Sequence, residues 1–300
     1  STLILCLLTV FLTGGRIYAW RSLQIHFLIV FCGVLTFCFY HIEKRAADPI
    51  LSVDFFRIRG FSTGNAAVFW SSFAIFSLFA YAPLYMQGVL KQNPLMVGMA
   101  MLSLSLGWSL GSLCLGQVLH HMEKRIAASV GALLLISGCA WTLFFSATTT
   151  LITCFSAFFL VGVGMGFVTL STLLSVQDSL ESAVLGVSTA SHQFFRTLGG
   201  TVGVGICGGL LTGRMNRGLA QVSEAAASGK IPEETLEKLS RNIEALFQTD
   251  ALTQLPENIY ALIQQAISRG TLAVFTAVVA AAVLCLICCI LVPTDKQMNL

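Results

Sequence analysis

Charged residues are absent from long stretches of this chain, and these stretches indicate its organisation. Seven long runs contain no Asp, Glu, Lys or Arg: residues 1–15, 22–42, 60–90, 92–122, 126–177, 197–213 and 270–294. A helix needs about 20 apolar residues to cross a hydrocarbon layer of about 30 Å. The pattern therefore predicts spanning helices near residues 25–42, 62–86, 95–119, 126–146, 151–173, 187–213 and 270–292. Residues 147–150 would form a short turn, and residues 3–13, too few to span, would be the tail of a helix that begins upstream.

The composition supports this prediction. The chain has 17 Lys and Arg and 14 Asp and Glu among 300 residues, and 56% of its residues are hydrophobic, whereas about a quarter of the residues of a soluble domain are charged. The net charge of +3 is small and no basic stripe is present, which argues against nucleic acid as a partner. We therefore expect an all-α polytopic membrane protein in contact with a lipid bilayer.

Basic residues in short loops predict the orientation of the spans, because they accumulate on the cytoplasmic side. One side carries eight of them and the other three: Lys44, Arg45, Arg57, Arg59, Lys124, Arg125, Arg196 and Lys296, against Arg16, Arg21 and Lys91. We expect the larger group to face the cytoplasm, which places residues 214–269 outside. Residues 232–248 and 256–268 have helical apolar spacing. They would either cap a translocation path or rest on the bilayer or the bundle rim.

Side chains suited to catalysis or metal binding are scarce in the predicted spans. All ten cysteines fall in apolar segments, where cysteine behaves as a small hydrophobic residue, and the histidines lack zinc-type spacing. Gly162, Gly164 and Gly166 lie within a predicted helix, where close packing is a better interpretation than a phosphate cradle. We expect neither an enzyme nor a bound cofactor or metal.

Glycine is concentrated in residues 187–213. Small residues recur four apart at positions 199 and 203, 205 and 209, and 209 and 213, a spacing that lets helix backbones approach closely. The pattern predicts either a helix at a moving interface or one that is statically packed.

Three sequence stretches carry a family resemblance. They are Glu43-Lys44-Arg45 with Asp48-Pro49-Ile50-Leu51; Tyr81-x-Pro83-Leu84-Tyr85-Met86-Gln87-Gly88 leading to Asn93-Pro94; and Gly186-x-Ser188-x-Ala190-x-x-Gln193-Phe194-Phe195-Arg196-x-Leu198-Gly199-Gly200-x-x-Gly203. These stretches resemble the C-terminal part of the fourteen-span EmrB/QacA-like drug:proton antiporters of the major facilitator superfamily. The resemblance covers nearly the whole chain.

The resemblance implies a domain organisation. Residues 1–42 would hold the truncated end of the first linker helix and the second linker helix, and residues 43–61 a cytoplasmic linker. Residues 62–292 would form the C-terminal six-helix transport bundle, built of two inverted three-helix repeats, with a long external amphipathic loop at 214–269. Residues 293–300 would be a cytoplasmic tail.

The resemblance also implies a function, namely proton-coupled export of small amphipathic, often cationic, compounds across the cell membrane by alternating access. In the family, the membrane-embedded acid belongs to an N-terminal six-helix bundle that is missing here and would be the partner. No Asp or Glu lies within a predicted span, so no proton-carrying residue is assigned. Gly116, Lys124 and Arg125 fit the degenerate second copy of the cytoplasmic loop motif of the family, and His120, His121 and Glu123 depart from it.

Two sets of candidate residues follow. For the substrate we expect an aromatic face with a polar neighbour: Phe69, Trp70, Phe73, Phe76 and Asn65; each aromatic residue could equally face lipid or the core. For gating and helix packing we expect Gly116, Arg125, Gln193, Arg196, Gly199, Gly200 and Gly203. Arg196 would either pair with Asp178 or Glu181, or extend towards the interface as a snorkelling arginine.

Two alternatives to transport remain at the level of the sequence. The chain could act by itself as a membrane-embedded scaffold or interaction protein, or it could be an inactive transporter fragment.

Overall fold

The computed structural model describes residues 53–118, 122–227 and 257–294, together with residues 22–24, 26–28, 30, 31, 33, 34, 37 and 41. The described part contains six helices long and apolar enough to cross a membrane, and no strand. They are α3 (Arg59–Gly88), α4 (Pro94–Val118), α5 (Lys124–Thr142), α6 (Leu151–Asp178), α7 (Leu185–Ala227) and α10 (Glu257–Leu291). Two short 3-10 turns, η1 (Val53–Arg57) and η3 (Ser182–Val184), precede α3 and α7. The predicted all-α membrane fold is confirmed.

The predicted linker helices are described only in part. The described positions between residues 23 and 41 are helical, and apolar side chains there, such as Phe27 and Phe37, are exposed. Residues 1–21, which include the predicted end of the first linker helix, lie outside the described residues.

The turn between α5 and α6 shows how local sequence ends a span. Residues 143–150 separate the two helices, so α5 ends four residues earlier than the predicted 146. Hydroxyl groups satisfy polar groups of this turn. The Ser146 N–H donates to Thr149 Oγ1 at 2.8 Å, and the Ser146 and Thr148 hydroxyls lie 2.9 Å apart. Short polar side chains compete with the helix for backbone hydrogen bonds, and the uncharged run is broken here.

The six helices are related in pairs. Of the first three helices (α3, α4 and α5) and the last three (α6, α7 and α10), α4 packs against α6 and, correspondingly, α7 packs against α3. Likewise α5 packs against α6 and α10 packs against α3. Exchanging the first three helices with the last three reproduces these pairings, which is the arrangement expected of two inverted repeats.

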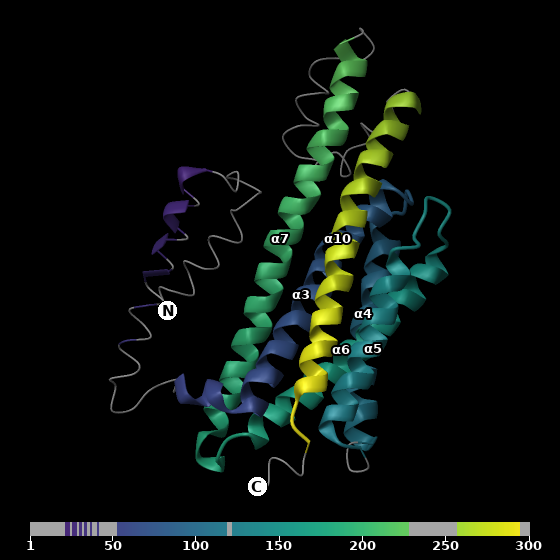
Figure 1. Ribbon diagram of the computed structural model, residues 1–300. Helices are drawn as coiled ribbons and strands as arrows, with labels where there is room; N and C mark the ends of the chain where they lie inside the picture. The colour runs from purple at the N-terminus through teal and green to yellow at the C-terminus, as the bar shows by residue number, and fades with distance from the viewer. Residues whose placement is uncertain are drawn as a thin grey trace.

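Helices α7 and α10 continue beyond the ends of the other helices at one end of the bundle (Figure 1). The expected helix at 256–268 is therefore the first part of α10 and is continuous with the last span. Its apolar face packs on the bundle, because Ile263 and Ile267 are buried and Gln264 Nε2 donates to the Val89 carbonyl just past α3 at 2.7 Å. The expected helix at 232–248 lies outside the described residues.

Candidate functional site

The seam between α3 and α7 is formed by glycines that face backbone. A Cβ at Gly203 would lie 2.6 Å from the Phe73 carbonyl oxygen and 2.7 Å from Ser77 Oγ, and one at Gly199 would overlap the Phe69 carbonyl. One turn further out, the Tyr81 hydroxyl donates to the Val204 carbonyl at 2.7 Å. These glycines therefore set the distance between the two helices.

The seam between α4 and α6 repeats this construction. A Cβ at Gly111 would lie 2.5 Å from the Val163 carbonyl oxygen, and one at Gly107 would overlap the Phe159 carbonyl. From the other side, Gly162 and Gly166 face the backbone of α4. The expectation that the glycines at 162–166 serve close packing is confirmed.

The predicted aromatic face of α3 divides into a buried and an accessible part. The Phe73 side chain is 5% exposed and belongs to the core, whereas Phe76 is 37% exposed and its ring covers Gly200 of α7. Trp70 is half-buried, with its ring centroid 5.2 Å from that of Phe69 and 5.9 Å from that of Phe73. Phe76 and the exposed edges of Phe69 and Trp70 thus lie on the accessible surface of the described bundle, whereas Phe73 contributes to packing.

A buried polar group lies where α3, α6 and α7 meet. His192 of α7 is fully buried, and its Nε2 lies 3.0 Å from Thr172 Oγ1 of α6. The Thr172 hydroxyl already donates to the Val168 carbonyl at 2.7 Å, so its oxygen accepts from His192 Nε2–H. We assign the Nε2–H tautomer on this ground, which leaves His192 Nδ1 as an acceptor without a partner among the described residues.

Asn65 lies close to this group. It is 1% exposed, and neither atom of its side-chain amide has a hydrogen-bond partner in the described part of the chain. The preceding residue, Gly64, packs on α6, where a Cβ would be 3.3 Å from the Thr172 carbonyl oxygen. A buried amide without partners is costly, which is typical of a position kept for a ligand or an ordered water.

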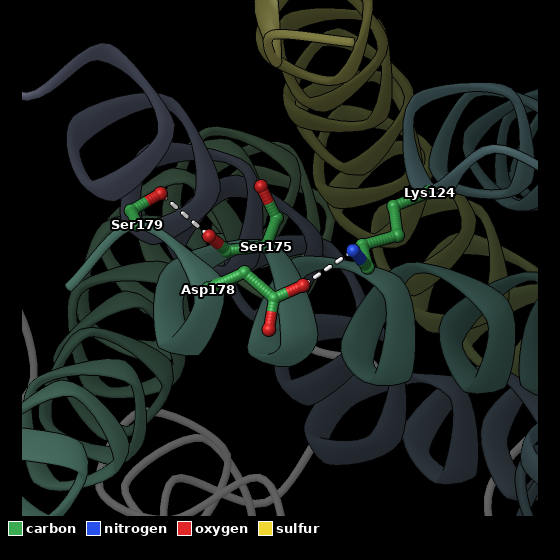
Figure 2. Close-up of polar contacts among 4 residues, drawn as sticks. All are labelled: Lys124, Ser175, Asp178 and Ser179. Atoms are coloured by element: carbon green, nitrogen blue, oxygen red, sulfur yellow. Dashed lines mark hydrogen bonds and ion pairs between the residues drawn. The ribbon is translucent and has the colours of Figure 1, made fainter. Parts of the chain in front are cut away.

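The bundle end predicted to be cytoplasmic is held by charges. Lys124 Nζ, at the start of α5, forms an ion pair with the Asp178 carboxylate at the end of α6 (Figure 2). In the same turn, the Ser179 hydroxyl donates to the Ser175 carbonyl at 2.6 Å. Arg59 Nε, at the start of α3, donates to the Leu291 carbonyl at the end of α10 at 3.1 Å.

The Asp178 carboxylate is bound by Lys124, and in the described part of the chain Arg196 forms an ion pair with neither Asp178 nor Glu181, the two expected partners. The guanidinium of Arg196 lies instead over the ring of Trp108 on α4, with its carbon 5.6 Å from the ring centroid. Gln193, three residues earlier, is exposed. Among the other gating candidates, Gly116 faces open space and Arg125 is half-buried at the start of α5.

Several residues of these contacts were not among the sequence candidates. Gly107 and Gly111 could have been found, because they have the same spacing as Gly199 and Gly203. Trp108 and Thr172 carry no such signal, since their partners come from helices distant in the sequence. Among the described residues no group of three His, Cys, Asp or Glu could hold a metal ion.

The arrangement of the helices is typical of one class of membrane protein. A bundle of six helices long enough to cross a membrane, in which the first three and the last three pack in corresponding ways, is the architecture of a secondary transporter. The chain belongs to the major facilitator superfamily, since the family model described as Major Facilitator Superfamily matches residues 2–204. Membership indicates a multi-pass membrane transporter rather than an enzyme.

Three similar proteins carry names that refer to multidrug transport, multidrug resistance or efflux. The chain is 29% identical over 257 residues to the multidrug transporter protein MdtP of Bacillus subtilis, covering 81% of this chain and 47% of that protein. It is 27% identical over 286 residues to multidrug resistance protein 3 of the same species, covering 91% and 53%. It is 25% identical over 224 residues to the efflux pump aflT of Aspergillus parasiticus, covering 73% and 43%. The chain spans about half the length of these curated relatives.

A solved structure agrees on the fold. It is a bacterial homologue of the human lysosomal transporter Spinster in an inward-facing and occupied conformation, similar at a TM-score of 0.56 and 12% identity. The match covers 95% of this chain and 66% of that chain.

Proposed function

We propose that this chain is the C-terminal half of a fourteen-span EmrB/QacA-like antiporter in the cell membrane, which exports amphipathic compounds in exchange for protons by alternating access. In this proposal a six-helix N-terminal bundle completes the transport path and supplies the proton-carrying acid. The named relatives support multidrug efflux, and the share of their length that the chain spans supports one bundle of two.

The observation that carries this proposal is the polar surface of α7 within the membrane. Gln193 is exposed and Arg196 is half-buried, and both belong to the candidate span Leu185–Met215. Such groups are costly against lipid tails and almost always face water or protein. This side of the bundle therefore suits a water-filled path closed by a second bundle.

The experiment that tests this proposal compares two proteins in inverted membrane vesicles. One is this chain alone, and the other is the chain joined to the coding sequence that precedes it in its gene. We expect uptake of ethidium or of a neutral dye into vesicles by the joined protein alone, driven by an inside-acid pH gradient and abolished when nigericin dissipates it.

Two results would contradict the proposal. Uptake by this chain alone, at the rate of the joined protein, would show that no second bundle is needed. Absence of gradient-dependent uptake with the joined protein, for a panel of cationic, neutral and anionic amphipaths, would exclude an efflux antiporter.

A further inference from the structure

Polar atoms without a partner gather inside the bundle where α3, α6 and α7 meet. Asn65 of α3 is 1% exposed, and Ser175 of α6 and His192 of α7 are fully buried. Both polar atoms of the Asn65 amide, the Ser175 hydroxyl and His192 Nδ1 have no hydrogen-bond partner in the described part of the chain. Such groups are costly to leave unpaired, and folded proteins satisfy nearly all of them, with protein or with ordered water.

Two of these side chains lie beside the contact that joins α6 to α7. His192 Nε2 is 3.0 Å from Thr172 Oγ1, and Ser175 lies three residues after Thr172, on the same face of α6. A second hydrogen bond, from Gln177 Nε2 to Thr189 Oγ1 at 2.9 Å, also joins the two helices. Ser175 therefore lies between two points at which α6 touches α7, on the side of α6 that carries the His192 contact.

Asn65 reaches the same place from α3. The preceding Gly64 packs on α6, where a Cβ would lie 3.3 Å from the Thr172 carbonyl oxygen. Phe69, four residues after Asn65 and therefore on the same face of α3, places its carbonyl against Gly199 of α7. Asn65 thus lies between the side of α3 that packs on α6 and the side that packs on α7, at the level of the Thr172 contact.

The unpartnered atoms complement a water molecule. A buried water typically makes about three hydrogen bonds, both as donor and as acceptor. His192 Nδ1 and Asn65 Oδ1 are acceptors, whereas the Asn65 amide N–H groups and the Ser175 hydroxyl are donors. A metal ion fits less well, because the three side chains include no carboxylate or thiol and the described residues hold no group of three His, Cys, Asp or Glu suited to one.

We propose that this junction binds internal water, with an ordered molecule that donates to His192 Nδ1 and to Asn65 Oδ1 and accepts from the Ser175 hydroxyl. The bond to Thr172 keeps the His192 proton on Nε2, which leaves Nδ1 as the acceptor that the water requires. The water joins all three helices at a place where these side chains do not bond to one another. The site is independent of the proposed function, since it holds a structural water and no substrate.

Solid-state NMR of the joined protein, isotope-labelled at the histidine ring nitrogens and reconstituted in lipid bilayers, tests the site at its acceptor. The His192 signals are those that disappear in His192→Gln. We expect a protonated Nε2 and an unprotonated Nδ1, and we expect Nδ1 to receive magnetisation from water protons.

Variants locate the water. Asn65→Leu removes the amide and fills its space with an apolar side chain, so the transfer from water to Nδ1 should be lost. The Nε2–H signal should persist in this variant and shows that the contact with α6 is still folded. Ser175→Ala should weaken the transfer. Ser71→Ala is the matched control and should leave the transfer unchanged, because this buried hydroxyl on α3 already donates to the Val68 carbonyl at 3.1 Å.

Three outcomes would overturn the inference. One is a wild-type protein in which His192 Nδ1 receives no magnetisation from water. Another is an equal transfer in Asn65→Leu, as expected for water that these side chains do not hold. The third is a direct bond from the Asn65 amide proton to Nδ1, since the two side chains would then satisfy each other. None of these outcomes bears on efflux, which is tested by dye uptake.

Discussion

The Nε2–H of His192 donates to the Thr172 hydroxyl oxygen at 3.0 Å, inside the bundle and away from solvent. This bond joins α7 to α6, and the hydrogen bond from Gln177 Nε2 to Thr189 Oγ1 at 2.9 Å joins them again about one turn away. Thr172→Val removes the acceptor and leaves a buried N–H unsatisfied, which costs about 1–3 kcal/mol. We expect a lower unfolding temperature for this variant by intrinsic fluorescence in detergent. Thr172→Ser, which keeps the hydroxyl, is the control, and equal destabilisation by both variants would argue against the hydrogen bond.

The glycine seams predict a position-dependent response to a single methyl group. Gly199→Ala and Gly203→Ala force α7 away from the α3 backbone, so each should lower the unfolding temperature and the transport rate. Gly213→Ala meets no atom within 4 Å and should be neutral or stabilise by up to about 1 kcal/mol, since alanine favours the helix. Thermal unfolding of all three variants measures this, and a uniform response would contradict a packed seam.

The two phenylalanines one turn apart on α3 should separate stability from substrate binding. Phe73→Ala opens a cavity in the core and should cost about 3–5 kcal/mol. Phe76→Ala removes a partly exposed ring, so we expect little loss of stability and a changed affinity for aromatic substrates. Unfolding curves and dye-binding constants for both variants are the measurements. A strongly destabilised Phe76→Ala protein would show that this ring is structural.

Asn65 should show an opposition between stability and function. Asn65→Leu replaces a buried amide that has no partner in the described residues by an apolar side chain of similar size, so the free energy of unfolding should rise. If the amide serves substrate or a water molecule in the path, transport falls in the same variant. Both are measurable on one preparation, with Asn65→Asp as the polar comparison. A variant that is less stable and fully active would refute this interpretation.

The ion pair at the predicted cytoplasmic end should respond to salt. The Lys124 side chain is 20% exposed and that of Asp178 46%, so screening limits the pair to about 1 kcal/mol or less. Asp178→Asn and Lys124→Gln should each destabilise slightly, and the exchange of the two charges in one protein should restore most of the loss. Unfolding at low and at high salt measures this, and a salt-independent difference would contradict an electrostatic origin.

The positions of the charged residues were sufficient to predict the six helices. The hydrophobic thickness of a bilayer fixes the length of a spanning helix, and the uncharged runs of the sequence are at least about that long. The close packing at Gly162 and Gly166 was predictable for a related reason, since glycines four apart lie on one helix face. Residues 256–268 were predicted as a helix running almost directly into the last span, and in the structure they are the first part of α10. The sequence did not show that Gln264 of this segment contacts the Val89 carbonyl.

The contacts of the candidate site were harder to predict. Asp178, Lys124 and Arg196 were all visible in the sequence, yet a carboxylate at a helix end has several basic residues within reach. Which one it binds depends on the packing of α5 against α6. The pairing of Arg196 with Trp108 joins residues 88 positions apart, and a single sequence contains no signal that relates them.

The glycine seams have a consequence for how this protein can diversify. Because α3 and α7, and α4 and α6, are joined by backbone against backbone, side chains on the exposed face contribute little to holding these helices together. An exposed residue such as Gln193 can therefore change without loosening the bundle. A scaffold of this kind tolerates substitutions on its exposed face, so that the surface it presents can change by single substitutions while the packing of the helices is kept.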